Sequence, residues 1–396
     1  MMKQKIAILW LTLFLVQSGC LEETNPAFDE KAFTKIYDNH RFSASYFPID
    51  IQQTSDGGYL ILGGRRLTTT TFSGIYLLKT DKFGNFVNDV EVDESYVNPV
   101  GDLMKIGADY YFLCMDPLTL QTHIARVDSN GEGFTTTPAS TSLTYPAAAS
   151  LDNTNIITLS YNSITLQSVI SVITSAGSVT SSKGYSIGAG EGVEEPIINH
   201  YLRTGRQFPF QTGKVGNLYF FNGFYNYTFS LVFTDLSQDV PNGVVQGQQD
   251  DGGLSAVVPV SGNTFAAGRF NFGDNFLLPR VTLNSAGISS STDLGGFTLP
   301  ELSPNATVRV IRAVFKNRNV VVFAANTKSK HVGLYFYDET TGEFISSRYV
   351  GYSNPFEIAS IRQTAEGDLI LCGTTYVAGR FGRFSIVKIP QNDIAI

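Results

Sequence analysis

Short apolar runs recur along most of the chain, and polar segments rich in Gly, Asn, Asp and Ser separate them. Val, Ile, Phe, Leu and Tyr dominate the runs, which is typical of strands packed into sheets. The intervening segments carry the residues that turns and hairpins require. No stretch shows convincing helical periodicity. The pattern therefore predicts an all-β protein.

One stretch of the chain occurs twice. Residues 51–64, IQQTSDGGYLILGG, align without a gap against residues 361–374, IRQTAEGDLILCGT. Farther along, IYLLKTD (75–81) matches FSIVKIP (384–390) almost in phase. The first and last parts of the chain are therefore copies of one unit, and such self-similarity is typical of repeat architectures.

Weaker copies lie between these two, each with an apolar second strand followed by an apolar third strand. Second strands are expected at 59–64, 109–115, 155–161, 218–224, 263–270, 319–326 and 368–374. Seven units of four short strands are thus predicted, with the period and content of a β-propeller blade. An insertion around 187–206 stretches the fourth unit, so six or eight blades remain alternatives.

The two ends of the repeat region are complementary. The last unit ends at QNDIAI after its third strand, and a strand-like segment, AFTKIYD (32–38), precedes the first unit. We expect this segment to supply the missing outer strand of the seventh blade. A ring closed in this way leaves no open sheet edge.

The repeated motif resembles a known group of proteins. Q-T-x-[DE]-G, followed in the first unit by K-T-D-x-x-G-N, is similar to propeller repeats of bacterial secreted and surface proteins. The similarity is specific in the first and last units and faint in the middle five. It implies a propeller and no single activity.

The N-terminus has the pattern of a targeting segment. Lys3 and Lys5 precede an apolar run at 6–16 that is shorter than a membrane span. The next residues, QSGC (17–20), resemble a bacterial lipoprotein signal, although Gln17 stands where an aliphatic residue is usual. We expect a signal peptide over 1–19 and lipidation of Cys20, with a plain secretory signal as the alternative.

The lipoprotein resemblance also implies a location. Residues 20–31 would form a lipid-anchored tether, and 32–396 the propeller domain. Leu21 is not the aspartate of an inner-membrane retention signal, and Glu22 and Glu23 resemble the acidic tag of some surface lipoproteins. The expectation is an outer-membrane lipoprotein that faces outward, with the periplasmic orientation left open. Its partners would be outer-membrane lipid, through Cys20, and an envelope protein or a glycan.

The net charge of −7 gives no electrostatic footprint for nucleic acid. Three cysteines are too few for a disulfide framework. Cys114 and Cys372 occupy similar places in second strands, near positions where other units carry small residues such as Gly63. We expect both thiols to be buried and inert, with the small residues allowing neighbouring blades to pack closely.

No motif for catalysis or for a cofactor stands out. The segment QTSDGG (53–58) lacks a phosphate-binding spacing, so Asp56-Gly57 is interpreted as a hairpin turn. No metal site is expected, because the four histidines, His40, His123, His200 and His331, lack ligand spacing. Whether the protein is an enzyme stays open, and the absence of a recognisable catalytic set favours a non-catalytic role.

The connections between second and third strands carry the most informative side chains. In a propeller they share one face with the connections between blades. FYNYTF (224–229) and RFNFGDNF (269–276) are interpreted as aromatic-rich loops on that face, accompanied by basic residues. The candidate binding residues are Arg65, Arg66, Tyr225, Tyr227, Arg269, Phe272, Arg380 and Arg383.

Two functions fit these residues. Tyr, Phe and Arg are enriched at protein interfaces, which favours a non-catalytic scaffold or binding module that docks an envelope protein. Aromatic rings beside polar groups also suit sugar recognition. The alternative is therefore a glycan-capture lipoprotein, or a divergent propeller hydrolase or lyase acting on glycans.

Overall fold

The computed structural model describes residues 32–38, 44–188, 191–202, 207–351, 354–377 and 381–396. Nearly all regular structure in these residues is β-strand, so the all-β prediction is confirmed. Residues 1–31, with the expected signal peptide, Cys20 and the tether, lie outside the described residues, as do His40 and Arg380.

The strands pair as antiparallel meanders in chain order. The first group consists of β2 (Tyr46–Gln53), β3 (Tyr59–Arg66), β4 (Ser73–Thr80) and β5 (Phe86–Glu91). The second consists of β6 (Val97–Ile106), β7 (Asp109–Met115), β8 (Thr122–Val127) and β9 (Thr135–Pro138), and one residue pair, Gly74 with Val97, links β6 to β4 of the first group. The third consists of β10 (Pro146–Asp152), β11 (Asn155–Asn162), β12 (Gln167–Thr174) and β13 (Val179–Ser186).

The later groups repeat this plan with local changes. One contains β14 (Gln211–Val215), β15 (Leu218–Tyr225), β16 (Thr228–Thr234) and β17 (Gly243–Gln246), and β21 (Ile288–Ser290) adds to β17 in parallel. The next contains β18 (Gly252–Ser261), β19 (Thr264–Asn271) and β20 (Asp274–Thr282). It is followed by β22 (Val308–Phe315), β23 (Arg318–Asn326), β24 (Val332–Asp338) and β25 (Phe344–Val350).

The last sheet joins the two ends of the described chain. It contains β26 (Phe356–Gln363), β27 (Leu369–Thr375) and β28 (Arg383–Ile389), and its fourth strand is β1 (Phe33–Tyr37). β1 pairs antiparallel with β28, from Phe33 opposite Lys388 to Tyr37 opposite Phe384. Two short 3-10 helices lie at Ser291–Leu294 and Gln391–Asp393.

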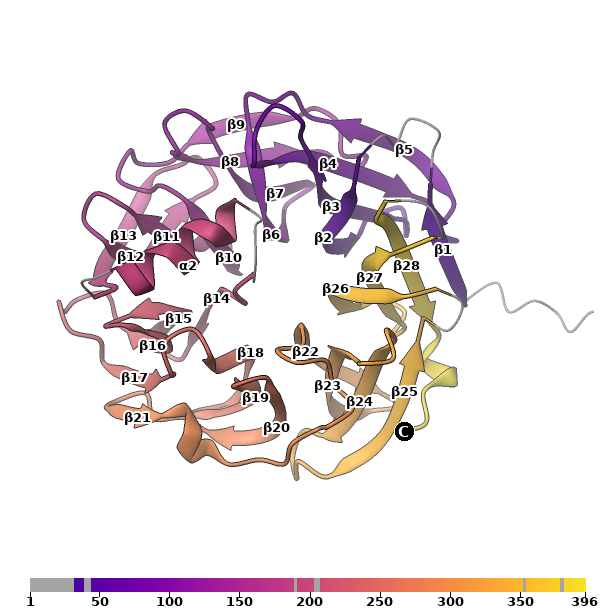
Figure 1. Ribbon diagram of the computed structural model, residues 1–396. Coiled ribbons are helices and arrows are strands. Elements are labelled where there is room, and N and C mark those ends of the chain that lie inside the picture. The colour runs from indigo at the N-terminus through magenta and orange to yellow at the C-terminus, as the bar shows by residue number, and fades with distance from the viewer. Residues whose placement is uncertain (1–31, 39–43, 189–190, 203–206, 352–353, 378–380) are drawn as a thin grey trace, which may run out of the picture. The chain divides into compact units, whose positions relative to one another are not determined.

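The sheets are arranged around a central axis (Figure 1). Their innermost strands contact one another in succession: β2 with β6, β6 with β10, β10 with β14, β14 with β18, β18 with β22, β22 with β26, and β26 with β2. Successive four-stranded sheets that pack face to face around an axis define a β-propeller. The protein is therefore a β-propeller over its described residues.

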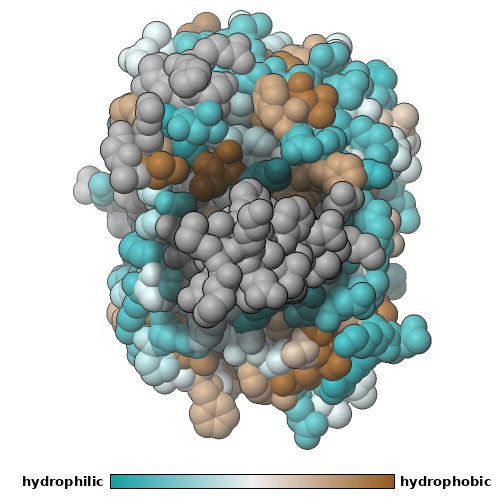
Figure 2. Space-filling view, turned by 90° about the vertical axis from the view of Figure 1, so that its right-hand side faces the viewer, coloured by the Kyte–Doolittle hydropathy of each residue, from teal (hydrophilic) through white to brown (hydrophobic). Residues whose placement is uncertain are grey.

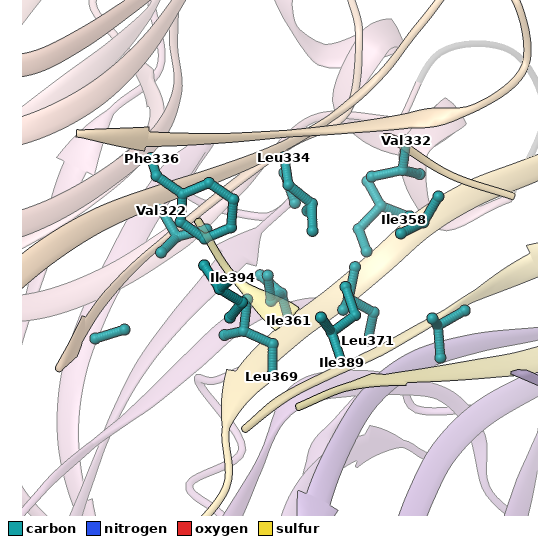
Figure 3. Close-up of a cluster of buried hydrophobic side chains, with 14 of the residues drawn as sticks. Val322, Val332, Leu334, Phe336, Ile358, Ile361, Leu369, Leu371, Ile389 and Ile394 are labelled. Carbon is teal, nitrogen blue, oxygen red and sulfur yellow. The ribbon is translucent and has the colours of Figure 1, made fainter. Parts of the chain in front are cut away.

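The hydrophobic core is distributed between neighbouring sheets. Between β22–β25 and the sheet of β26–β28, the side chains of Val322, Leu334 and Phe336 face Ile358, Leu369 and Leu371 (Figure 3). Similar clusters lie between other sheets. This packing explains why second and third strands are continuous apolar runs: both of their faces are buried.

Small residues allow the sheets to approach closely. A Cβ atom added to Gly63 of β3 would lie 2.1 Å from Cζ of Phe384 in β28 and 2.5 Å from the carbonyl oxygen of Phe47. The expectation that Gly63 makes room for a neighbouring blade fits this contact, and the neighbour is the sheet of β26–β28. Cys114 and Cys372 are fully buried, unpaired thiols, and burial raises the pKa of each.

The duplicated Q-T-x-[DE]-G segment has a structural role. The Thr54 amide bonds the Gly58 carbonyl at 2.9 Å, and Gly57 has a φ of +82° that glycine adopts without strain. Asp56 also accepts from the ammonium group of the buried Lys79 at 2.9 Å. In the second copy, Lys388 and Asp368 are 3.3 Å apart. The motif is a hairpin held by a lysine of the third strand.

Sequence reasoning was wrong about helices in one place. The insertion contains α2 (Glu191–Tyr201), whose side chains Val193, Ile197 and Tyr201 are buried at intervals of four residues. This spacing is helical, but the stripe is only three residues long and Pro196 interrupts the segment, so the signal was weak. Among the residues that the structure describes, no helix is long and apolar enough to cross a membrane.

The flank of the propeller at the right of Figure 1 carries mainly hydrophilic side chains in its visible part, with apolar groups scattered among them (Figure 2). Single apolar residues on a surface are ordinary. The two regions with distinctive chemistry are the central cavity and the face that carries the connections between second and third strands. We call the latter the loop face.

Candidate functional site

The innermost strands enclose a central cavity of about 560 Å³. Its wall is formed by residues that are far apart in the sequence, among them Pro48, Val100, Ala148, Gln211, Val257, Arg309 and Ile358. A volume of this size lies in the range of small-molecule sites, roughly 300–1,000 Å³. The wall combines apolar side chains with polar groups, and its carboxylate and guanidinium groups belong to Asp50, Asp102, Arg309, Glu357 and Arg362.

A buried ion pair lies in one sector of this wall. Asp50 of β2 is 2% exposed and accepts from Arg362 of β26 through Nε at 3.2 Å and Nη2 at 2.5 Å. The Ser360 hydroxyl and the Leu103 amide also donate to Asp50, at 2.5 Å and 2.7 Å. Burial alone would raise the pKa of Asp50, but these donors favour the charged form, and the pKa is lowered.

Asp102 of β6 lies beside this pair with a different environment. Its carboxylate is 3.7 Å from Nη2 of Arg362, and its side chain is 55% exposed to the cavity. Loss of hydration raises the pKa of Asp102 to about 6; attraction to Arg362 offsets part of this rise, and repulsion from Asp50 adds to it. Asp102 is thus a carboxyl group available to a molecule in the cavity.

Arg309 of β22 completes the cluster. Its Nε donates to the carbonyl oxygen of Ala359 at 2.5 Å, which fixes the plane of the guanidinium group. Burial lowers the pKa of Arg309, and attraction to Asp102 and Asp50 opposes that effect. The cavity therefore presents a fixed guanidinium group and a carboxyl group from two different sheets. We call Asp50, Asp102, Arg309, Ser360 and Arg362 the channel cluster.

Aromatic residues that follow α2 border another part of the cavity. Phe208 and Phe210 line it together with His200, whose Nδ1 accepts from the Phe208 amide at 2.9 Å. The His200 ring also meets Phe210 edge to face at a centroid distance of 4.7 Å. The hydroxyl of Tyr201 donates to the carbonyl oxygen of Tyr145 at 2.6 Å, which ties the helix to the sheet of β10–β13. The insertion thus brings apolar ring surface to the cavity.

The loop face can be recognised from backbone hydrogen bonds between its connections. The Arg66 amide bonds the Ser45 carbonyl, and the Phe272 amide bonds the Asp251 carbonyl. Each bond joins the end of a second strand to the segment that enters the same sheet. The arrangement of connections on this face therefore follows the expected propeller pattern.

The predicted site residues of the first sheet lie at this face. Arg65 is partly exposed and lies 3.6 Å from Glu91 and 3.7 Å from Glu94. Arg66 is exposed at the end of β3. The charge of Arg65 is partly compensated within the protein, whereas the structure gives Arg66 no ion pair in its described surroundings. Binding by either residue stays a prediction.

The two aromatic segments are mostly strand rather than loop, which corrects the expectation. β15 continues to Tyr225 and β16 begins at Thr228, so the connection is two residues, Asn226 and Tyr227, with φ of 45° and 72°. Phe272 and Gly273 form an equally short connection. Both turns have the paired positive φ values of tight hairpins, which lets the strands extend to the loop face.

These aromatic residues differ in what they contact. Tyr225 packs edge to face on Tyr185, whereas the side chains of Tyr227 and Phe272 are exposed by 47% and 69%. Arg269 is 5% exposed, stacks on the Phe276 ring at 3.7 Å and donates to the Gly295 carbonyl at 3.0 Å. Its main contacts are therefore within the protein.

Arg383 is also held internally, at the first position of β28. Its side chain is 1% exposed, and its Nε donates to Asp38 at 2.7 Å. Its Nη1 donates to the carbonyl oxygens of Ala44 and Gly382, at 3.2 Å and 3.1 Å. Sequence reasoning placed Arg383 in a loop, but the strand begins here, and the arginine joins the segment after β1 to the last sheet.

A feature that sequence reasoning missed is a series of exposed apolar side chains at the tips of this face. They come from the connections between second and third strands of five different sheets. Their exposed fractions are 91% for Leu118, 90% for Ile164, 69% for Phe272, 57% for Phe381 and 47% for Tyr227. Exposed apolar side chains from several sheets on one face are a feature that interaction surfaces share.

Metal ligands do not cluster in the described part of the chain. No group of three or more His, Cys, Asp or Glu side chains there could hold a metal ion. The described histidines lie in three different places: His123 lies against Tyr96, His200 against Phe210, and His331 beside Ser329. These three side chains have separate surroundings.

Comparison with known proteins gives fold similarity only. No protein-family model matches the chain, and no curated protein matches it. Among solved structures, it is similar to the β-propeller domain of the Trilobed protease from Pyrococcus furiosus, with a TM-score of 0.48, 9% identity, and coverage of 88% of this chain and 97% of that one.

Two further structures show how varied these neighbours are. A variant of the NanB sialidase from Streptococcus pneumoniae has a TM-score of 0.46 and 11% identity, covering 91% of this chain and 71% of that one. The WD40 domain of Toxoplasma gondii coronin has a TM-score of 0.39 and 10% identity, and the match covers 90% of this chain and 76% of that one. Because all three scores are below 0.5, the propeller assignment rests on the sheets and their contacts.

Proposed function

We propose that this protein is a non-catalytic binding module that docks a protein of the cell envelope through its loop face. The observation that carries the proposal is the set of exposed apolar tips, Leu118, Ile164, Tyr227, Phe272 and Phe381. Transfer of such side chains from water into an interface is favourable by about 25 cal/mol per Å² of apolar surface.

The proposed scaffold is a seven-bladed ring closed by β1. It is supported by the sheets described above and by the contact of β26 with β2, which follows the contacts of the other innermost strands. In this arrangement β1 is the outer strand of the last blade, paired with β28. A rigid ring holds the apolar tips at fixed separations, which reduces the entropy lost on docking.

The proposed location is the outer membrane, with Cys20 lipidated after removal of residues 1–19. The support is the QSGC sequence and the acidic residues that follow it. Phe33, the first residue of β1, lies beside Tyr59 and Gly84, at the face opposite the loop face.

Site-specific photo-crosslinking in intact cells tests the docking proposal. A crosslinking amino acid at position 272 or 227 is expected to give one defined adduct whose partner is identified by mass spectrometry. The matched control is position 86, because Phe86 is 53% exposed but begins β5 at the opposite face. Equal adducts from all three positions, or none from 227 and 272, would contradict the proposal.

The proposed location has its own test. Cys20→Ser is expected to abolish incorporation of labelled palmitate and to release the protein from the membrane fraction. Protease treatment of intact cells should then degrade the wild-type protein if it faces outward. Retention of label in Cys20→Ser would refute lipidation at this residue without affecting the docking proposal.

A further inference from the structure

The central cavity is chemically distinct from the loop face, and its groups define what it can bind. The carboxylate oxygens of Asp50 already accept hydrogen bonds from Arg362, Ser360 and the Leu103 amide. Asp50 therefore serves to position Arg362. Asp102 makes one long ion pair, at 3.7 Å. Nε of Arg309 donates to a backbone carbonyl oxygen, so its two terminal nitrogens are the atoms that can donate to a molecule in the cavity.

We propose that this cavity binds a small neutral polyhydroxylated molecule of the sugar class, with Asp102 and Arg309 as its polar contacts. Each hydroxyl group both donates and accepts a hydrogen bond. A sugar can therefore donate to the Asp102 carboxylate and accept from Arg309 with neighbouring hydroxyls. The two residues come from β6 and β22, so only the assembled propeller creates this pair.

The charge balance favours a neutral ligand over an ion. Asp50 and Asp102 balance Arg309 and Arg362, and Glu357 adds a further carboxylate to the cavity wall. A free anion would be repelled by the carboxylates of Asp102 and Glu357, and an ammonium ion would be repelled by the guanidinium groups of Arg309 and Arg362. An uncharged molecule avoids both repulsions and still satisfies the exposed donors and acceptors.

The apolar part of the wall has the complementary chemistry. Phe47 and Phe210 are half-buried and line the same cavity, whereas the Phe208 ring is buried against Phe224 and Phe229 behind Phe210. Aromatic rings bind the C–H faces of sugars while polar groups bind the hydroxyls, which is the usual composition of a small-molecule site. A cavity of about 560 Å³ has room for a monosaccharide or disaccharide.

Ligand-observed NMR by saturation transfer on the full chain tests this proposal. The probes are neutral sugars (glucose, galactose, mannose, N-acetylglucosamine, maltose, cellobiose and lactose), with galacturonate and lysine as charged controls. At least one neutral sugar is expected to show saturable binding. Binding of the charged probes alone, or of no neutral sugar, overturns the proposal.

Two variants locate the binding. Asp102→Asn removes the carboxylate with little change of shape and should weaken the observed binding at least tenfold. Ala147→Phe narrows the cavity without altering the channel cluster and should have a similar effect. The control is Asp109→Asn, which disrupts an ion pair with Arg126 at 2.7 Å outside the cavity, and its affinity should be unchanged.

Thermal unfolding of each variant separates loss of fold from loss of binding. If sugar binding persists in both folded cavity variants, or falls equally in Asp109→Asn, the cavity is not the site. Docking through the loop face is a separate property: crosslinking from position 272 should be the same in Asp102→Asn as in the wild type. The two proposals can therefore fail independently.

Discussion

Arg362 of β26 and Asp50 of β2 form a buried ion pair between residues that are 312 positions apart in the sequence. The pair joins the first innermost strand to the last, at the junction where the two ends of the chain meet. We expect Asp50→Ala to lower the free energy of unfolding by about 3 kcal/mol, because Arg362 loses both hydrogen bonds to Asp50 and keeps only the Asp102 carboxylate at 3.7 Å. Urea denaturation measures this loss.

A double-mutant cycle checks the origin of that loss. Asp50→Ala combined with Arg362→Met should cost clearly less than the sum of the single changes, because neither charge is then left unpaired. Additive losses would contradict a direct coupling between the two residues. Asp109→Asn is a suitable comparison, since it disrupts a more exposed pair and should change stability by less than about 1 kcal/mol.

Arg383 should behave as a structural residue. Its guanidinium group is buried and bonded to Asp38 and to two backbone carbonyls. Arg383→Met should therefore lower the free energy of unfolding by about 3 kcal/mol, since Asp38 and the carbonyls lose their donor. The exposed Arg66 gives the matched control: Arg66→Met should stay within about 0.5 kcal/mol. Equal effects of the two changes, measured in urea, would refute this assignment.

Gly63 should tolerate no side chain. An added methyl group would collide with the Phe384 ring and with a backbone oxygen, so Gly63→Ala should cost about 1–3 kcal/mol. Gly192 in α2 has open space around it, and Gly192→Ala should gain about 0.5–1 kcal/mol from helix propensity. Thermal unfolding of both variants tests the contrast, and a stable Gly63→Ala would mean that the two sheets can separate without cost.

Asp102 should titrate within the physiological pH range. Loss of hydration inside the cavity raises the pKa of Asp102 to about 6, so the folded protein binds this proton more tightly than the unfolded chain does. The stability that this proton contributes is present below the ordinary value of 3.8 and is lost as pH rises through 6. We therefore compare the free energy of unfolding of Asp102→Asn with that of the wild type at two pH values. The difference should favour the variant more at pH 8 than at pH 4, by about 1 kcal/mol or less after solvent screening.

The charged groups around Asp102 provide an internal check of this titration. Asp50 repels its carboxylate, whereas Arg362 and Arg309 attract it. Carbon-13 NMR should give a midpoint near 6 in the wild type and a higher midpoint in Arg309→Met, because one attraction is removed. A wild-type midpoint near 4 would contradict the raised pKa.

Much of the fold could be predicted because the repeat is recorded in the sequence. Residues 51–64 and 361–374 align directly, and both form a first strand, a hairpin and a second strand. The expected pairing of residues 32–38 with the last repeat corresponds to β1 beside β28. The second and third strands must be apolar because both of their faces are buried. Their repeated apolar runs therefore locate these strands in the sequence.

The channel cluster could not be predicted in the same way. Asp102 and Arg309 lie on first strands of different repeats, where neither residue belongs to a local motif. The two residues meet because their sheets are arranged around one axis and face the same cavity. No spacing along the chain reveals this arrangement. A partial signal was present, because charged residues such as Arg309 and Arg362 interrupt first strands that otherwise pack against neighbours.

Arginine in a predicted connection proved to be an ambiguous signal. Arg66 is exposed at the loop face, whereas Arg269 and Arg383 are buried by a ring and by a carboxylate. The sequence does not distinguish these outcomes, because the burying groups come from distant segments. The exposed apolar tips were missed because a single apolar residue in a connection, such as Leu118 or Ile164, is not informative by itself. Only the structure shows that several of them lie on one face.

The pairing of β1 with β28 also bears on when the protein can fold. The Ser385 hydroxyl donates to the Lys35 carbonyl at 3.0 Å, across a separation of 350 residues. β28 is synthesised some 350 residues after β1, so the two strands can pair only after all the intervening sheets have been made. Such long-range pairing slows folding. A chain that stays open for so long would remain accessible to a translocation pore, as the export proposed above requires.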